Sequence, residues 1–223
     1  MPLHILRFRP ALLALLRTIL FLGSMANVVT AGAASLNVTV IDKNNALLDD
    51  AVIYAVPVSA IVAPPKRGGI VDQVNKEFQP YVTAVQTGTA VSFPNKDNIR
   101  HHVYSFSPAK TFELRLYSGS PSKPVVFDKP GVVILGCNIH DWMLTYVYVV
   151  DTPYFATTAK GGVRIDGIPA GEYELRAWHP QLRGAPPSQR LTVGAQDSAH
   201  RIALDLGPKP SAGSANPAAK ATP

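Results

Sequence analysis

The sequence contains a single cysteine among 223 residues. One thiol cannot form an intrachain disulfide, a four-cysteine zinc or iron–sulfur site, or any cluster that needs two thiolates. Charged side chains are also scarce, at 16% of residues, whereas hydrophobic ones make up 47%. This composition excludes a disordered polyampholyte, and a chain of this length can form one or two packed cores.

Positive charge is scarce in the part of the chain that is expected to fold. The net charge is +6, but five basic residues lie near the two ends: Arg7, Arg9, Arg17, Lys209 and Lys220. The remainder carries a net charge of about +1, which is too little for a surface that tracks phosphates. We therefore expect no nucleic-acid binding.

Motifs of hydrolytic enzymes are missing. The chain has no Gly-x-Ser-x-Gly elbow, no phosphate-binding loop and no His-Glu-x-x-His sequence. Each of these motifs places a nucleophile, a phosphate cradle or a metal at a defined turn or helix. We predict that the protein is not an enzyme.

The N-terminal region has the pattern of a secretory signal. Basic residues come first, an apolar run follows, and the sequence Ala-Gly-Ala over 31–33 offers a small-x-small cleavage site. Arg17 interrupts the apolar stretch, which is therefore shorter than the ~20 residues of a membrane-spanning helix. We predict that residues 1–33 are a signal peptide, with an uncleaved anchor as the alternative. The mature protein is expected in the periplasm, with no membrane span.

Between the two ends, the chain consists of short segments in which apolar and polar residues alternate. Turn residues such as glycine, proline and asparagine separate them, and no segment has a helical pattern. The expected strands are 36–41, 50–56, 82–85, 90–93, 102–106, 111–117, 125–127, 132–135, 144–150, 162–165, 173–178, 189–193 and 200–206. Many short strands of this kind are typical of antiparallel sandwiches or barrels, so we predict an all-β protein.

The most distinctive side chains lie in one loop between two expected strands. Cys137, His140 and Met143 follow one another at Cys-x₂-His-x₂-Met spacing, and His101 and His102 offer another imidazole upstream. Thiolate and thioether favour copper, and imidazole suits copper as well. Two histidines, one cysteine and a weak axial methionine form the blue-copper electron-transfer site. The residues therefore predict a copper site.

Other roles for Cys137 remain open at this point. A lone cysteine is most often a small buried hydrophobe, and a cysteine near a histidine can be a nucleophile. Zinc could accept one cysteine and two histidines, although it gains little from the thioether of Met143. The combination with an upstream histidine in an exported all-β chain favours copper.

Residues 72–151 resemble a cupredoxin, the family of plastocyanin, pseudoazurin and amicyanin. The likeness rests on Gly-Thr-Ala-Val-Ser-Phe-Pro-Asn over 88–95 and on the loop 137–143, which leads into a final strand and is as short as that of amicyanin. It implies a Greek-key β-sandwich with one type 1 copper per chain. The implied ligands are His101, Cys137, His140 and Met143.

Two adjacent histidines compete for the first ligand position. In the family the ligand is followed by a polar residue and then an aliphatic one, which favours His101 over His102. In a regular strand His102 points to the opposite face, although a bulge could exchange the two. Trp142 is expected either to shield the metal from water or to contact a partner.

The loop also departs from the family pattern. Leu135 stands where the family usually has an aromatic residue, Gly136 directly precedes Cys137, and no proline lies between Cys137 and His140. These departures concern loop geometry, colour and reduction potential rather than the ligand set.

A second resemblance covers the flanking segments. Residues 36–53 look like the opening of a carboxypeptidase regulatory-like, transthyretin-type β-sandwich, and residues 162–180 look like its later part. Neither part alone is large enough to form such a sandwich, so we expect the cupredoxin unit to be inserted in it. The alternative is two consecutive domains that meet near Tyr154. The expected limits are 1–33 for the signal, 34–66 and 152–206 for the outer sandwich, 67–151 for the cupredoxin unit and 207–223 for a disordered tail.

Taken together, these inferences predict a periplasmic blue-copper protein that passes single electrons by cycling Cu(II)/Cu(I). Its expected partner is a redox protein such as a periplasmic dehydrogenase or a c-type cytochrome. Two alternatives belong to other classes. One is a copper carrier module, which would bind Cu(I) preferentially and release it, and the other is a metal-free envelope β-sandwich that binds carbohydrate or protein.

Overall fold

The computed structural model describes residues 33–59, 68–121 and 123–209. These residues form strands β1 to β17 and no helix, so the predicted all-β class is confirmed. Within the same ranges, no helix is long and apolar enough to span a bilayer. Residues 1–32 of the predicted signal, 210–223 of the predicted tail and the expected limit at 66–67 lie outside the described residues.

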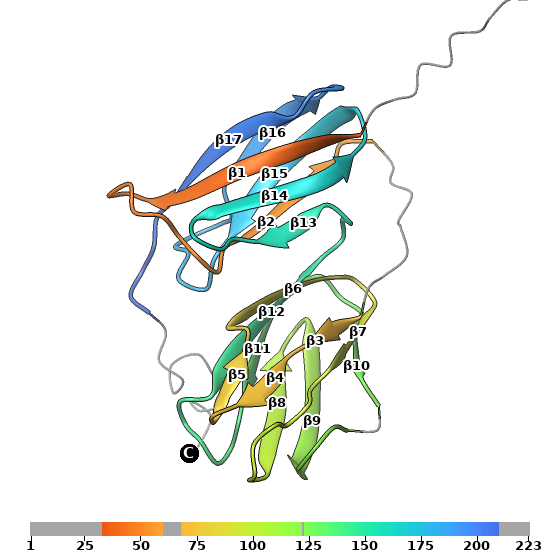
Figure 1. Ribbon diagram of the computed structural model, residues 1–223, viewed down its shortest axis with the longest axis vertical. Coiled ribbons are helices and arrows are strands. Elements are labelled where there is room, and N and C mark those ends of the chain that lie inside the picture. The colour runs from red at the N-terminus through yellow and green to blue at the C-terminus, as the bar shows by residue number, and fades with distance from the viewer. Residues whose placement is uncertain (1–32, 60–67, 122, 210–223) are drawn as a thin grey trace, which may run out of the picture. The chain divides into compact units, whose positions relative to one another are not determined.

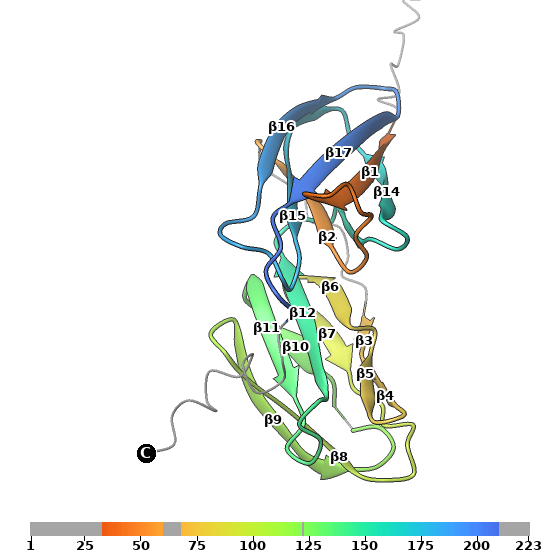
Figure 2. The same ribbon diagram turned by 90° about the vertical axis from the view of Figure 1, so that its left-hand side faces the viewer.

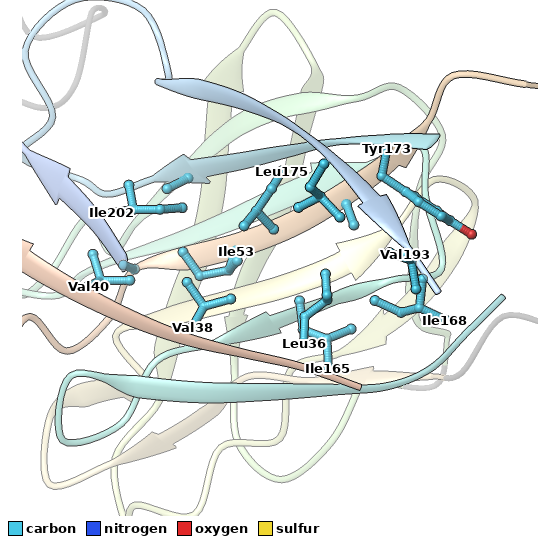
Figure 3. Packing of buried hydrophobic residues seen from close by; sticks show 14 of the residues in the cluster. Leu36, Val38, Val40, Ile53, Ile165, Ile168, Tyr173, Leu175, Val193 and Ile202 are labelled. Atoms are coloured by element: carbon cyan, nitrogen blue, oxygen red, sulfur yellow. The ribbon is translucent and has the colours of Figure 1, made fainter. Parts of the chain in front are cut away.

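One group of strands comes from the two ends of the described chain. β1 (Ala34–Asp42) lies between β14 (Gly162–Ile168) and β17 (Ser198–Leu204) in a three-stranded sheet. A four-stranded sheet has the order β13 (Phe155–Thr157), β2 (Val52–Pro57), β15 (Gly171–Trp178) and β16 (Ser188–Val193). Aliphatic side chains of both sheets, such as Leu36 and Leu175, pack into one core (Figure 3). Its transthyretin-type identity and the domain limits stay predictions.

The strands between residues 69 and 150 form a second group (Figure 1). The largest sheet has the order β6 (Val82–Gln86), β12 (Leu144–Val150), β11 (Gly131–Gly136), β8 (His101–Ser107) and β9 (Lys110–Tyr117). A second sheet has the order β10 (Val125–Phe127), β7 (Thr89–Ser92) and β3 (Gly69–Ile70), and β4 (Asp72–Val74) pairs with β5 (Glu77–Gln79). Phe93 and Phe127 fill the core of this group, which also contains Cys137 and Met143.

Strand β12 is buried on both faces. Because successive side chains of a strand point to opposite sides, Val147 and Val149 belong to the core that contains Cys137. Tyr146 and Tyr148 belong instead to a third cluster with Trp178 of β15. The rings of Tyr148 and Trp178 are stacked, with centroids 4.5 Å apart and an interplanar angle of 17°. Figure 2 shows β12 beside β11, with which it pairs along its length.

The sheets are mixed, whereas the sequence predicted an antiparallel arrangement. β1 pairs with β17, β6 with β12 and β3 with β7 in parallel. The partners in the first two pairs are far apart in sequence, so no hairpin turn in the sequence signals their pairing. Four short strands, β3, β4, β5 and β13, were not predicted, because none of them has a run of three apolar residues such as the Val-Val-Phe of β10.

Candidate metal centre

Asn95 shapes the loop that leads into β8. Its side-chain amide donates to the carbonyl oxygens of Ile99, at 2.8 Å, and Tyr117, at 2.9 Å. Its side-chain oxygen accepts a hydrogen bond from the backbone N–H of Asp97, at 3.0 Å. An asparagine that bonds the backbone two residues further on forms a local turn. These three bonds fix the path of the chain up to His101, the first residue of β8.

His101 is fully buried, and one of its ring nitrogens has no hydrogen-bond partner in the described residues. Its Nε2 lies 2.7 Å from a carboxylate oxygen of Asp97. Because a carboxylate only accepts hydrogen bonds, Nε2 carries the proton and Nδ1 keeps its lone pair. This Nδ1 is itself buried and has no hydrogen-bond partner in the described part of the chain. A buried acceptor without a donor is costly, which is the condition that a bound cation would relieve.

The loop between β11 and β12 carries the other three predicted ligands. Cys137 follows the last residue of β11 and is buried, and His140 is half-buried at the turn. The backbone N–H of Met143 donates to the carbonyl of His140, at 3.0 Å, which closes the turn before β12 begins. Met143 is buried in the same core cluster as Cys137.

The fold brings three of these side chains together. Ligand atoms of His101, Cys137 and His140 all lie within 4.8 Å of one another. The Sγ of Cys137 is 3.9 Å from Nδ1 of His140, and the two histidine rings have centroids 5.0 Å apart. In N/S sites with bonds of about 2.0–2.3 Å, donors of one ion lie about 3–4 Å apart. The cluster therefore fits a single metal ion, with soft and borderline donors that suit copper.

His102 lies outside the cluster. The pairing of β8 with β9 shifts register between His101 and Val103, so the irregularity considered above is present. It does not exchange the two histidines, because His101 and not His102 has a ring nitrogen within 4.8 Å of the ligand atoms of Cys137 and His140. Nε2 of His102 lies instead 2.9 Å from a carboxylate oxygen of Glu113. Elsewhere, Nδ1 of His179 accepts a hydrogen bond from the backbone of Gln181, at 3.1 Å, which agrees with a structural role.

Burial, hydrogen bonds and nearby charges shift the pKa of two groups of the site. Desolvation by itself would raise the pKa of Asp97, but hydrogen bonds from the backbone N–H of Lys76, from His101 and from the N–H of Asn75 lower it below its usual value. Asp97 is therefore an anion at neutral pH. Desolvation lowers the pKa of His140, and the nearby His101 and Lys76 add to this effect while Asp97 opposes it. A low pKa keeps the imidazole neutral, as metal ligation requires.

Three contacts around the site were not predicted from the sequence. Asp97 stands four residues before His101, and only this spacing could have indicated that the two side chains meet. The ring of Tyr104 lies over Gly136, where a Cβ would be 2.9 Å from the ring's Cζ and Oη. Trp142 is 62% exposed and donates its indole N–H to the carbonyl of Lys76, at 3.0 Å, so it lies at the surface beside His140.

Comparison with known proteins gives structural likenesses only. No protein-family model and no curated protein matches the chain. A copper-containing nitrite reductase from Thermus scotoductus SA-01 is similar at 24% identity over 42% of this chain, with a TM-score of 0.36, and the chain spans only 25% of that protein. A purple cupredoxin from Nitrosopumilus maritimus is similar at 20% identity over 37% of this chain and 99% of its own, with a TM-score of 0.33.

A reduced Cu(I) form of an amicyanin variant is similar at 17% identity over 44% of this chain and 99% of its own, with a TM-score of 0.35. All three identities are below 25% and all three TM-scores are below 0.5. These likenesses therefore assign no function to the chain, and the case for a metal rests on the side chains themselves.

Proposed function

We propose that the protein is an exported type 1 copper protein that carries single electrons between redox partners. Two observations together support this proposal: ligand atoms of His101, Cys137 and His140 lie within 4.8 Å of one another, and Nδ1 of His101 is buried without a hydrogen-bond partner in the described part of the chain. A thiolate, two imidazoles and a nearby thioether are the donor set of electron-transfer copper.

The chain's own residues have distinct tasks in this proposal. His101, Cys137 and His140 would hold one copper ion, and the thioether of Met143 would be a weaker ligand. Copper, when bound, supplies a Cu(II)/Cu(I) couple that accepts and returns one electron. The core around Cys137 and Met143 excludes water, which is a main determinant of reduction potential. His140 is half-buried, so its outer edge is the expected point of electron entry.

The proposal also covers location and partners. A signal peptide over 1–33 would deliver the protein to the periplasm, where a dehydrogenase or a c-type cytochrome would exchange electrons with it. The protein would catalyse no reaction of its own. Trp142 and Ile139 flank His140 and are 62% and 48% exposed, which supports contact with a partner at this edge.

Titration of the metal-free mature chain, residues 34–223, with Cu(II) tests the proposal. We expect an intense visible thiolate-to-copper band that saturates at one copper per chain, bleaches with reductant and is absent in Cys137→Ser. His101→Gln should abolish the band, whereas the matched control His102→Gln should keep it, because His102 is not part of the cluster of possible ligands.

Each contrary outcome has a definite meaning. If the wild type shows no band but binds Cu(I) tightly, the protein is a copper carrier rather than an electron carrier. If it binds neither copper state, the cluster is structural and the protein is a metal-free β-sandwich. If His102→Gln and His101→Gln behave alike, the ligand assignment is wrong.

A further inference from the structure

The turn between β4 and β5 has an unusual backbone. Val74 and Glu77 face each other in the pair, so the turn consists of Asn75 and Lys76. Both have positive φ, 57° and 61°, as in the type I′ turns that favour asparagine and glycine. Asparagine tolerates this conformation, but lysine adopts it at a steric cost. The turn therefore needs support from outside the hairpin.

Asp97 provides that support and also holds His101. One carboxylate oxygen accepts the backbone N–H of Asn75, at 2.7 Å, and the other accepts that of Lys76, at 2.8 Å. The second oxygen is also the one that lies 2.7 Å from Nε2 of His101. A single carboxylate thus joins the turn to the histidine.

The same turn is joined to the loop that carries His140. The carbonyl oxygen of Lys76 accepts the indole N–H of Trp142, at 3.0 Å. The centroids of the Trp142 and His140 rings are 5.1 Å apart. The peptide groups of Lys76 therefore connect, through Asp97 on one side and Trp142 on the other, to the two segments that supply the histidines.

We propose that the Asn75–Lys76 turn, with Asp97 and Trp142, positions both histidines of the cluster before a metal binds. Asp97 is the positioning residue of His101: it holds the proton on Nε2 and leaves Nδ1 free. Trp142 holds the loop of His140 against the turn. Histidine ligands commonly donate their second nitrogen to a carboxylate in this way, and loss of that partner weakens metal affinity. The identity of the metal rests on the proposed function, but the positioning role does not.

Two substitutions of Asp97 separate its charge from its contacts. Asp97→Ala removes every acceptor. Asp97→Asn can keep one oxygen at the shared position, but its amide then faces the N–H of Asn75, so one hydrogen bond and the negative charge are lost. Glu113→Gln is the matched control, because Glu113 bonds the neighbouring His102 outside the cluster.

The first measurement is nitrogen NMR of the histidine rings in the metal-free full chain at neutral pH. We expect the wild type and Glu113→Gln to hold His101 with the proton on Nε2 alone. Asp97→Ala should give a mixture of both tautomers, and Asp97→Asn a smaller admixture. Trp142→Phe, which keeps the ring but not the N–H, should broaden the His140 signals and leave the His101 tautomer unchanged.

The second measurement is the affinity for Cu(II) and Cu(I), by competition with a chelator. Asp97→Ala should weaken Cu(II) binding by about 10–100-fold, and Asp97→Asn should lower the ratio of Cu(II) to Cu(I) affinity, because the anion favours the higher cation charge. Glu113→Gln should change both affinities by no more than about twofold relative to the wild type, because it alters a carboxylate that lies outside the cluster.

Several results would overturn the proposal. An unchanged His101 tautomer in Asp97→Ala, or unchanged His140 signals in Trp142→Phe, would remove the positioning role of that residue. If the alanine variant does not fold, Asp97→Asn decides the role of Asp97 by tautomer and affinity ratio. If the wild type binds no copper at all, the proposed function fails, and the metal-free NMR still decides whether the turn positions the histidines.

Discussion

Replacing Gly136 by alanine tests why a glycine directly precedes Cys137. Gly136 lies opposite Tyr104 in the pairing of β11 with β8. A Cβ at this position would lie 2.9 Å from Cζ and Oη of the tyrosine ring. Non-bonded carbons settle at about 3.5–4.0 Å, so the ring must move by at least about 0.6 Å. The backbone of Gly136 is not left-handed, so this contact is the main penalty.

The size of the effect follows from the surroundings of Tyr104. Overpacking costs about 1–3 kcal/mol, and Tyr104 is half-buried, so its ring can move outward and the lower end applies. We expect Gly136→Ala to lower the free energy of unfolding by about 1 kcal/mol. In a Tyr104→Ala background the contact is gone, and alanine instead restricts the unfolded chain, which raises this free energy by about 0.4–1 kcal/mol.

The sign of the Gly136→Ala effect should therefore reverse between the two backgrounds. The four proteins of this double-mutant cycle can be compared by urea denaturation of the metal-free full chain, followed by circular dichroism. The expected coupling between the two sites is about 1.5–2 kcal/mol. A Gly136→Ala effect of equal sign and size in both backgrounds would refute the reasoning, because Tyr104 would then not be the reason for the glycine.

Three further predictions concern burial. Trp178→Ala removes the ring stacked on Tyr148 and should cost about 3–5 kcal/mol of unfolding free energy in thermal or urea denaturation; a loss under 1 kcal/mol would contradict this. Burial raises the pKa of Tyr117 to about 12, so a tyrosinate that forms near that pH in ultraviolet titration should be missing from Tyr117→Phe. Desolvation lowers the pKa of His179. The contribution of this histidine to the free energy of unfolding is therefore complete above its unfolded pKa of about 6.5, and it is lost as pH falls through the folded pKa. His179→Asn, which keeps an acceptor for the N–H of Gln181, should flatten the decline in unfolding free energy below pH ~6.5, and an unchanged slope would exclude this histidine as a cause.

The predictable part of the fold was the part with a local pattern. Strands β10 and β12 have the predicted bounds, 125–127 and 144–150, because both are continuous runs of apolar and β-branched residues. The parallel pairing of β1 with β17 joins segments about 160 residues apart, and alternation does not identify a strand's partner. The two-residue strand β3 is formed by pairing with β7 rather than by any pattern of its own.

The cluster of His101, Cys137 and His140 consists of residues named from the sequence, but the contacts that hold them were not predicted. Cys137 and His140 share one short loop with Met143, and the spacing of the three residues suggested a metal site; the ligand role of Met143 stays a prediction. The contact of Asp97 with Lys76 spans 21 residues and depends on how the β4–β5 hairpin lies against the loop before β8. Hydrogen bonds of this kind involve backbone groups, which every residue has, so no residue type in the sequence indicates them.

Strand β12 has a consequence for anyone who wishes to work with the strands around the candidate metal centre by themselves. A fragment that ends at residue 150 would keep the core around Cys137 but would turn Tyr146 and Tyr148, now covered by the cluster with Trp178, toward water. Such a fragment would expose an aromatic patch on the face of its largest sheet that points away from the core with Cys137, and exposed patches of this kind promote self-association. Isolating these strands therefore begins with polar replacements of Tyr146 and Tyr148, which belong to another cluster than Cys137 and Met143.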